Sequence, residues 1–335
     1  MIDKPNLTPA IMMAPLVEML SKENTTETGF ACGFFNVRTA NQCLKDAQTQ
    51  PIPRDLYYSM IFEGEICILF ADNGIGKSIF AVQIADYISR TDRVLYFDLE
   101  LSDKQFESRY SANYQNHYLF NDNFYRVNFM RPIEIPDKTE YDTYFIECLK
   151  EAVNKTDAKI VIIDNMSSLI DTDTDSAKAA IPLMRRLQDL KFENDLTLLL
   201  LEHNKKVDKS RPIVKNDLQG SKMKSNFADS ILSIGSSEID KHIRYVKQIK
   251  VRSGEMIYDS ENVAVYEKVQ EDSFLQLKFI KYGVESEHLK QQNEIDVKKR
   301  IEEVKELSTQ GKTQRQISTE LGISLGTVNK YLKNK

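Results

Sequence analysis

Apolar residues in the first two thirds of the chain fall into short continuous runs. Five of these runs lie at residues 66–70, 93–99, 125–129, 159–164 and 196–201. Continuous runs of this length are typical of parallel strands that are covered on both faces. Stretches with a helical pattern separate the runs, so we predict an α/β core built on a mainly parallel sheet.

Later apolar runs follow one another without intervening helices. They lie at residues 230–234, 243–251, 263–268 and 274–280. We therefore expect an antiparallel edge on the same sheet. Near the N-terminus, Thr39 is followed three residues later by Gln42, a capping-box pattern that predicts a helix through about Ala47.

The composition changes after Tyr282. Residues 285–293 are mostly polar and charged and are typical of a linker. Three helical patterns follow, at 295–307, 313–321 and 325–332, with a tight turn at Gly322 between the last two. We expect four parts: a leader (1–55), the α/β core (56–284), the linker (285–293) and a small all-α domain (294–335).

Cysteines and apolar stretches indicate the cellular compartment. The four cysteines have neither CxxC spacing nor a Cys/His cluster, which favours reduced thiols. Residues 10–20 contain Pro15 and Glu18, so we expect a short amphipathic helix there and not a signal peptide. No run approaches the ~18 apolar residues of a membrane span. We expect a cytoplasmic protein with no membrane partner.

The formal net charge of -5 argues against indiscriminate binding of polyanions. Its distribution changes that picture. Residues 205–224 have a net charge of +5, and the final 25 residues have a net charge of +4. The basic side chains of the first segment are Lys205, Lys206, Lys209, Arg211, Lys215, Lys222 and Lys224. They predict a loop that follows a nucleic-acid backbone; a solvated loop without a ligand is the alternative.

A glycine-containing loop connects the first apolar run to a helical pattern at 79–88. It consists of Ala71, Asp72, Asn73, Gly74, Ile75, Gly76, Lys77 and Ser78. Glycines let the main chain approach phosphates, which bind at the start of a helix. Lys77 would reach the β- and γ-phosphates of a nucleotide, and the Ser78 hydroxyl would bind Mg²⁺. The loop is a Walker A sequence with Ala71 in place of the first glycine; a chance Gly-Lys-Ser turn is the alternative.

Two carboxylates end other predicted strands. Asp164 ends the run at 159–164, where a Walker B aspartate would meet the shell of Mg²⁺. Glu100 follows the run at 93–99 and would polarise the water that attacks the γ-phosphate. Asp98 competes with Glu100 for that role, because strand alternation directs both to the same face.

The residues around Glu100 carry a resemblance to a known family. Phe97-Asp98-Leu99-Glu100-Leu101-Ser102, with Gln105 and Arg109, resembles a segment of RecA-fold hexameric helicases of the DnaB and plasmid RepA type. The resemblance covers residues 60–280. It extends to His203 at the end of a strand, to Gly220-Ser221 with Phe227-Ala228-Asp229, and to Lys250-Val251-Arg252-Ser253-Gly254.

This resemblance implies a RecA-like P-loop core that binds ATP and Mg²⁺ and assembles as a homo-oligomer, a hexamer. His203 would sense the γ-phosphate, and Arg109 would contact the adenine. Lys250 and Arg252 would enter the active site of a neighbouring subunit. Loop 205–224 would line the central channel and bind single-stranded DNA. A satisfied strand-end histidine, a surface arginine and an exposed pair of cations on an edge strand are the alternatives.

The C-terminal helices resemble the helix-turn-helix of resolvases and transcription regulators, with Ser318 allowing close helix crossing and Gly322 in the turn. This implies contact with duplex DNA through Ser324, Gly326, Thr327, Asn329 and Lys330. A protein-docking module is the alternative. The combined prediction is an ATP-driven DNA helicase. A non-translocating ATP switch, or a DNA-binding regulator of plasmid or mobile-element replication or transfer, is the rival.

Overall fold

The computed structural model describes residues 29–137, 139–169, 177–205, 208–290 and 294–333. Contacts within the chain divide it into two units, residues 1–53 and 54–335. The helix expected at 10–20 lies outside the described residues. None of the helices in the described ranges has the length and apolar character needed to cross a membrane.

The described part of the first unit is a small hairpin followed by a helix. Strands β1 (Phe30–Cys32) and β2 (Phe35–Val37) pair antiparallel, and α2 (Ala40–Ala47) follows them. The Thr39 hydroxyl accepts a hydrogen bond from the Gln42 N–H at 3.2 Å, which confirms the predicted helix start. The Gln42 side chain donates to Asp46 Oδ1 at 2.6 Å and does not complete the capping box. None of these three elements contains a buried residue.

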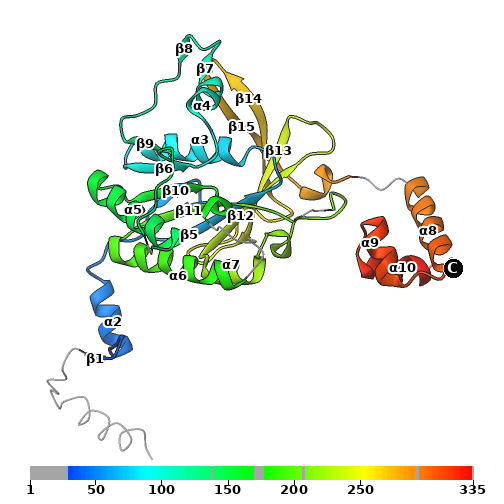
Figure 1. Ribbon diagram of the computed structural model, residues 1–335, viewed down its shortest axis with the longest axis horizontal. Helices are drawn as coiled ribbons and strands as arrows, with labels where there is room; N and C mark the ends of the chain where they lie inside the picture. Colours follow the sequence, from blue (N-terminus) through cyan, green and yellow to red (C-terminus); the bar gives the residue numbers. More distant parts are fainter. Residues whose placement is uncertain (1–28, 138, 170–176, 206–207, 291–293, 334–335) are drawn as a thin grey trace, which may run out of the picture. The chain divides into compact units, whose positions relative to one another are not determined.

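Nine strands form the central sheet of the second unit, in the order β15-β14-β13-β12-β5-β11-β10-β6-β9 (Figure 1). Six strands run parallel: β5 (Ile66–Ala71), β6 (Val94–Asp98), β9 (Phe124–Val127), β10 (Ile160–Asp164), β11 (Thr197–His203) and β12 (Ser230–Ser236). Three strands add an antiparallel edge: β13 (Ile243–Lys250), β14 (Val263–Glu271) and β15 (Phe274–Gly283). The predicted α/β sheet is confirmed.

Helices cover both faces of this sheet. α3 (Lys77–Ser89) packs on one face, and α5 (Tyr141–Thr156) and α6 (Ala177–Asn194) pack on the other (Figure 1). On β5, Leu69 belongs to the cluster that contains α3, and Ile68 belongs to the opposite cluster. Because successive side chains of a strand point to opposite faces, burial on both faces requires a continuous apolar run.

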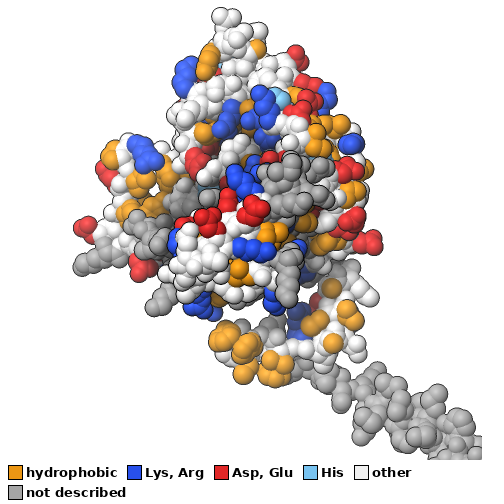
Figure 2. Space-filling model, turned by 90° about the vertical axis from the view of Figure 1, so that its right-hand side faces the viewer, with side chains coloured by type: hydrophobic (Ala, Val, Ile, Leu, Met, Phe, Trp, Pro, Cys, Tyr) orange, Lys and Arg blue, Asp and Glu red, His pale blue; other side chains and the backbone are white. Residues whose placement is uncertain are grey.

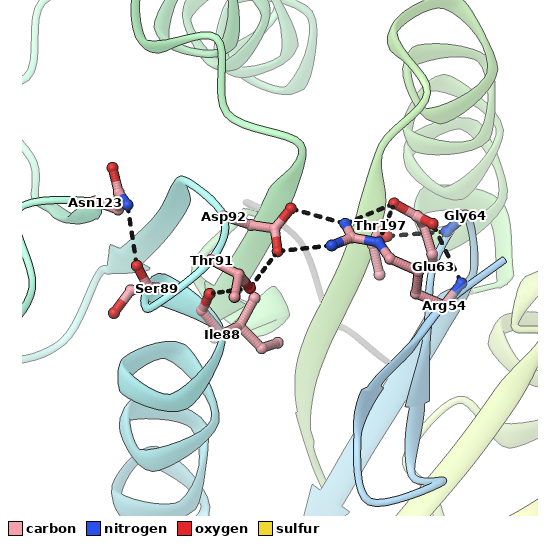
Figure 3. Close-up of polar contacts among 9 residues, drawn as sticks. All are labelled: Arg54, Glu63, Gly64, Ile88, Ser89, Thr91, Asp92, Asn123 and Thr197. Atoms are coloured by element: carbon pink, nitrogen blue, oxygen red, sulfur yellow. Dashed lines mark hydrogen bonds and ion pairs between the residues drawn. The ribbon is translucent and has the colours of Figure 1, made fainter. Parts of the chain in front are cut away.

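Shorter elements surround the sheet. They are α4 (Asp103–Arg109), α7 (Ser221–Phe227), the 3₁₀ helices η1 (Met166–Leu169) and η2 (Lys215–Asp217), and the hairpins β3 (Asp55–Tyr57) with β4 (Ile61–Phe62) and β7 (Ser111–Ala112) with β8 (Asn116–His117). Arg54 fastens the first of these hairpins to the turn after α3 (Figure 3). Its Nη2 donates to Glu63 Oε1 at 2.8 Å and to Asp92 Oδ1 at 2.7 Å.

The segment expected to be a linker begins inside the core. η3 (Glu285–His288) follows β15, and Glu285 is 0 % exposed. Its carboxylate forms an ion pair with Lys247 and accepts a hydrogen bond from the Ile213 N–H at 2.8 Å. Five residues after Glu285, the Lys290 N–H donates to the Lys209 carbonyl at 2.9 Å. The linker prediction for 285–293 is therefore wrong for its first residues, because a buried ion pair holds a polar segment in place.

Three helices form the C-terminal part of the chain. α8 (Glu294–Thr309), α9 (Gln314–Leu321) and α10 (Leu325–Lys333) pack around Val304, Ile317, Val328 and Tyr331. A capping box at Thr313 starts α9, and Gly322 ends it in the left-handed conformation, with φ 63°. The helix boundaries agree closely with those expected from the sequence.

Candidate nucleotide-binding site

The loop at 71–78 joins the carboxyl end of β5 to the first turn of α3. Ala71 is the buried last residue of the strand, so a side chain is accommodated where a glycine was expected. Gly74 and Gly76 have φ values of 72° and 121°, which favour glycine. The first N–H groups of α3 have no partner within the helix, and the helix dipole attracts an anion there. The geometry suits a phosphate group.

Lys77 lies where the ends of β5 and β11 are neighbours. The strand register pairs Ala71 with His203, so the lysine meets both residues. Its Nζ donates to the Ala71 carbonyl at 3.2 Å and lies 3.1 Å from His203 Nδ1. Burial lowers the pKa of Lys77, while the nearby carboxylates oppose that shift. Burial also lowers the pKa of His203, which favours its neutral form.

Asp164 ends β10 and is buried beside the helix start. Its Oδ2 accepts a hydrogen bond from the Tyr96 hydroxyl at 2.7 Å. Burial raises the pKa of Asp164 to about 6, although hydrogen bonds from Ser78 and Tyr96 act in the opposite direction. Ser78 and Asp164 therefore lie side by side. A hydroxyl and one carboxylate fit Mg²⁺, which commonly takes its other ligands from phosphates and water.

Asn165 connects two of the predicted site residues. Its Nδ2 donates to Glu100 Oε1 and lies 3.1 Å from His203 Nε2. The side chain is buried, and its Oδ1 accepts a hydrogen bond from the Ser168 N–H at 3.2 Å. The contacts form a series from Lys77 through His203 and Asn165 to Glu100. Asn165 was not among the site residues predicted from the sequence, although a polar residue directly after a parallel strand was a usable signal.

Asp98 differs from Glu100 in its surroundings. Asp98 is buried, and its Oδ2 accepts from Arg126 Nε at 2.9 Å while its Oδ1 accepts from the Leu101 N–H at 2.9 Å. Glu100 is exposed and contacts Asn165. Because Asp98 is already neutralised by an arginine, Glu100 is the better candidate for the base.

Arg109 lies at the end of α4, with its side chain half-buried. Its backbone carbonyl accepts a hydrogen bond from Gln270 Nε2 at 3.3 Å, which holds the end of the helix beside β14. A role of this arginine in adenine binding stays a prediction.

Lys250 and Arg252 lie near the amino ends of the parallel strands, whereas the loop at 71–78 lies at their carboxyl ends. Lys250 Nζ donates to the carbonyls of Ser225 and Ala228, at 3.1 and 2.5 Å. Arg252 Nη1 contacts Asp229 Oδ1 at 2.7 Å. The other oxygen of Asp229 accepts from the N–H of Ile66, the first residue of β5. The six residues of β5 span ~16 Å, so these cations are remote from the loop of their own chain.

The described basic residues of 205–224 differ in burial and in their acidic partners. Lys224 is 1 % exposed and pairs with buried Glu202, so its assignment to nucleic acid is corrected. Arg211 pairs with Asp217, and Lys209 pairs with Glu238 at 2.7 Å. Figure 2 likewise shows basic and acidic side chains interspersed on the face it presents.

Two lysines of this segment are exposed, and no ion pair involves them among the described residues: Lys205 and Lys215. Lys206 and the side chain of Lys222 lie outside the described part of the chain. In the C-terminal helices, Ser324 Oγ accepts from the Thr327 N–H at 3.1 Å and so caps α10. Lys330 is exposed on the same helix, and Asn329 is half-buried.

The glycine loop, the strand-end Asp164 and the mainly parallel sheet define a P-loop ATPase with a RecA-type core. A family model described as an AAA domain matches residues 37–209, just over half of the 335 residues. The chain belongs to this AAA domain family. No curated protein matches it.

The matched range includes Lys77, Glu100, Asp164 and His203. It ends inside the basic segment, before Arg252 and the three C-terminal helices. The match therefore covers the candidate nucleotide site, and the assignments beyond residue 209 depend on the residues themselves.

Proposed function

We propose that this chain is an ATP-dependent DNA motor of the RepA-like hexameric helicase kind. It would act on single-stranded DNA and be recruited to duplex DNA by its C-terminal helices. The observation that carries the proposal is the division of the site. Lys77, Asn165 and Glu100 lie together at the carboxyl ends of the parallel strands, whereas Lys250 and Arg252 lie near the amino ends of these strands.

In this proposal the N–H groups of residues 74–78 and the Lys77 ammonium bind the phosphates of ATP. Ser78 and Asp164 hold Mg²⁺, which would neutralise phosphate charge. Glu100 orients the attacking water and accepts its proton. Burial lowers the pKa of His203 and so favours its neutral form, and its ring lies between Lys77 and Asn165, where it would respond to the γ-phosphate.

Arg252 would complete the site of a neighbouring subunit. Its side chain is 61 % exposed, and its ion pair with Asp229 leaves the rest of the guanidinium accessible. A cation supplied in trans to a phosphoryl-transfer site typically raises the rate ~10³ to 10⁵-fold. A chain that uses such a residue needs an oligomer, and a ring of six is the arrangement of the similar helicases.

DNA would be bound at two places. Lys205 and Lys215 belong to the segment that follows His203 directly. A movement of His203 on nucleotide binding would therefore be transmitted to them through the backbone. Ser324, Thr327, Asn329 and Lys330 would meet duplex DNA from α10. The exposed lysines and the three-helix arrangement support these assignments.

ATP hydrolysis measured against protein concentration tests the division of the site. We expect the specific activity to rise steeply as the chain assembles, and Arg252→Ala to lower it on the order of 10³-fold. A mixture of Arg252→Ala with Lys77→Ala subunits should recover part of the activity, because each variant supplies what the other lacks. Specific activity that stays constant down to a demonstrated monomer would contradict the proposal.

A second candidate is a non-translocating ATP switch or DNA-binding regulator of plasmid or mobile-element replication or transfer. It is favoured by the internal pairing of Lys209, Arg211 and Lys224, which leaves few basic groups for a translocating strand. Unwinding of a forked duplex distinguishes the two. A helicase separates the strands while it hydrolyses ATP, whereas a switch hydrolyses ATP and leaves the fork intact.

A further inference from the structure

Arg244 makes an unusual contact with the loop at 71–78. It belongs to β13, on the antiparallel edge of the sheet, and is 9 % exposed. Its Nε donates to the Ile75 carbonyl at 2.7 Å. Its Nη1 donates to the carbonyls of Lys241 and Ile243, at 2.7 and 2.8 Å. The guanidinium therefore connects the start of β13 to the tip of the loop.

The Ile75 carbonyl belongs to the same peptide group as the Gly76 N–H. A trans peptide is planar, and its carbonyl and N–H point in opposite directions. A hydrogen bond that fixes the Ile75 carbonyl toward Arg244 therefore fixes the Gly76 N–H away from Arg244. Gly76 precedes α3 directly, so this N–H belongs to the group that would face a phosphate.

The loop needs such a restraint because of its glycines. Gly74 and Gly76 have no side chains to limit their backbone angles, and a β-carbon on Gly74 would meet no atom within 4 Å. A cavity of about 420 Å³ lies between residues 72–75 and the turn from β12 to β13. Arg244 lines this cavity and is the side chain there that bonds to Ile75.

A second restraint acts at the start of the loop. Lys77 Nζ donates to the Ala71 carbonyl at 3.2 Å, but that lysine would turn toward phosphate when a nucleotide binds. Arg244 instead donates to backbone carbonyls alone in this structure, one of the loop and two at the start of β13. Burial also lowers the pKa of Arg244, although the guanidinium stays charged.

We propose that Arg244 is a positioning residue that holds the Ile75–Gly76 peptide with its N–H directed at the phosphates before the nucleotide arrives. The proposal depends on the proposed function, since it assumes that the loop binds a nucleotide. Preorganised N–H donors bind charge without a cost of reorganisation. Strand β13 then serves two sites: Arg244 at its start supports the loop of its own chain, and Lys250 at its end serves a neighbour.

The test is equilibrium binding of ATP, ADP and AMP to Arg244→Gln, Arg244→Lys and the wild type. We expect Arg244→Gln to raise the Kd of ATP and ADP about 10-fold, as for loss of one well-placed hydrogen bond. Arg244→Lys keeps one donor and should raise it about threefold. The Kd of AMP, which lacks the β-phosphate, should change less than twofold. A purely structural loss would weaken all three ligands together.

Lys241→Met is the matched control. Lys241 lines the same cavity and carries the same charge, but the contact to Ile75 comes from Arg244. Equal weakening in Lys241→Met and Arg244→Gln would overturn the positioning role in favour of simple charge attraction. A Kd of ADP in Arg244→Gln equal to that of the wild type would also overturn it.

Two further outcomes have definite meanings. If the wild type binds no ATP, the proposed function fails, and this is separate from any effect of Arg244. If Arg244→Gln does not fold, as judged by circular dichroism, the conservative Arg244→Lys carries the test. An ADP affinity of Arg244→Lys identical to that of the wild type then contradicts the proposal.

Discussion

The carboxyl ends of the parallel strands and the basic segment 205–224 differ in whether their polar side chains contact one another. At the strand ends, Lys77, Glu100, Asn165 and His203 come from four separate stretches of sequence and meet within hydrogen-bonding distance. In the basic segment, three cations pair with three separate acidic residues. Sheet topology brings side chains from distant stretches of sequence into contact, whereas side chains that are only adjacent in sequence need not share contacts.

The largest expected effect tests the strand-end group. Glu100→Gln removes the carboxylate that we propose orients the attacking water, so we expect ATP turnover to fall on the order of 10² to 10⁴-fold while ATP binding changes little. Steady-state hydrolysis and equilibrium binding measure the two effects. Asp103→Asn is the control, since it removes a nearby carboxylate that is 84 % exposed and pairs with Arg126. Equal losses in both variants would contradict the role of Glu100.

The next effect tests whether Lys224 stabilises the folded protein through its ion pair with Glu202. Lys224→Met leaves the Glu202 carboxylate buried without its partner, so we expect about 3–5 kcal/mol less free energy of unfolding. Denaturant unfolding measures the loss. Lys205→Met, at an exposed position, should change the free energy by less than about 0.5 kcal/mol. If both variants lose stability equally, the contrast between the two lysines is wrong.

A smaller effect concerns the burial of Asp164. Its pKa is about 6 in the folded protein against 3.8 for the free group, so the folded state binds the proton more tightly. Folding is therefore favoured when Asp164 is protonated, and its contribution to stability falls as the pH rises from about 4 to about 6. Without Mg²⁺ and nucleotide, Asp164→Asn should be about 1–3 kcal/mol more stable than wild type at pH 8.

At pH 4 that advantage should largely disappear, because both side chains are then neutral. Thermal unfolding at the two pH values measures the difference. A gain in stability of Asp164→Asn that is the same at pH 4 and pH 8 would show that the charge of Asp164 is not its cause.

The smallest effect tests the exposed remainder of the basic segment. Lys205→Gln combined with Lys215→Gln should lower the salt dependence of single-stranded DNA binding by ~1.4 in the slope of log K against log salt, which corresponds to ~0.7 for each lost phosphate contact. Lys209→Gln should change the slope less, because Lys209 is paired with Glu238. Anisotropy titrations at several salt concentrations give these slopes, and an unchanged slope in the double variant removes the segment from the DNA site.

The strands were predictable because burial on both faces leaves a direct mark on the sequence. The runs that contain Ile68 and Ile162 need no knowledge of their neighbours to be recognised. The glycine loop was predictable for a similar reason, since the loop, the strand before it and the helix after it are contiguous in the chain.

Arg244 and Lys224 were not predictable in the same way. Arg244 contacts a residue 169 positions away, and Lys224 pairs with a glutamate 22 positions away. Such contacts depend on the strand order and on the face that each side chain takes, which local patterns do not encode. The hairpins β3-β4 and β7-β8 were missed because strands of two or three residues leave too short a pattern.

The buried pair of Lys247 and Glu285 determines where the chain can be cut. A truncation before residue 285 would delete the carboxylate and leave the Lys247 ammonium without its counter-charge, and it would leave the Ile213 N–H without its acceptor. The bond between Lys290 and Lys209 would be lost with it. A core fragment intended for crystallisation or biochemistry should therefore end after Lys290, although the composition alone recommends ending it near Tyr282.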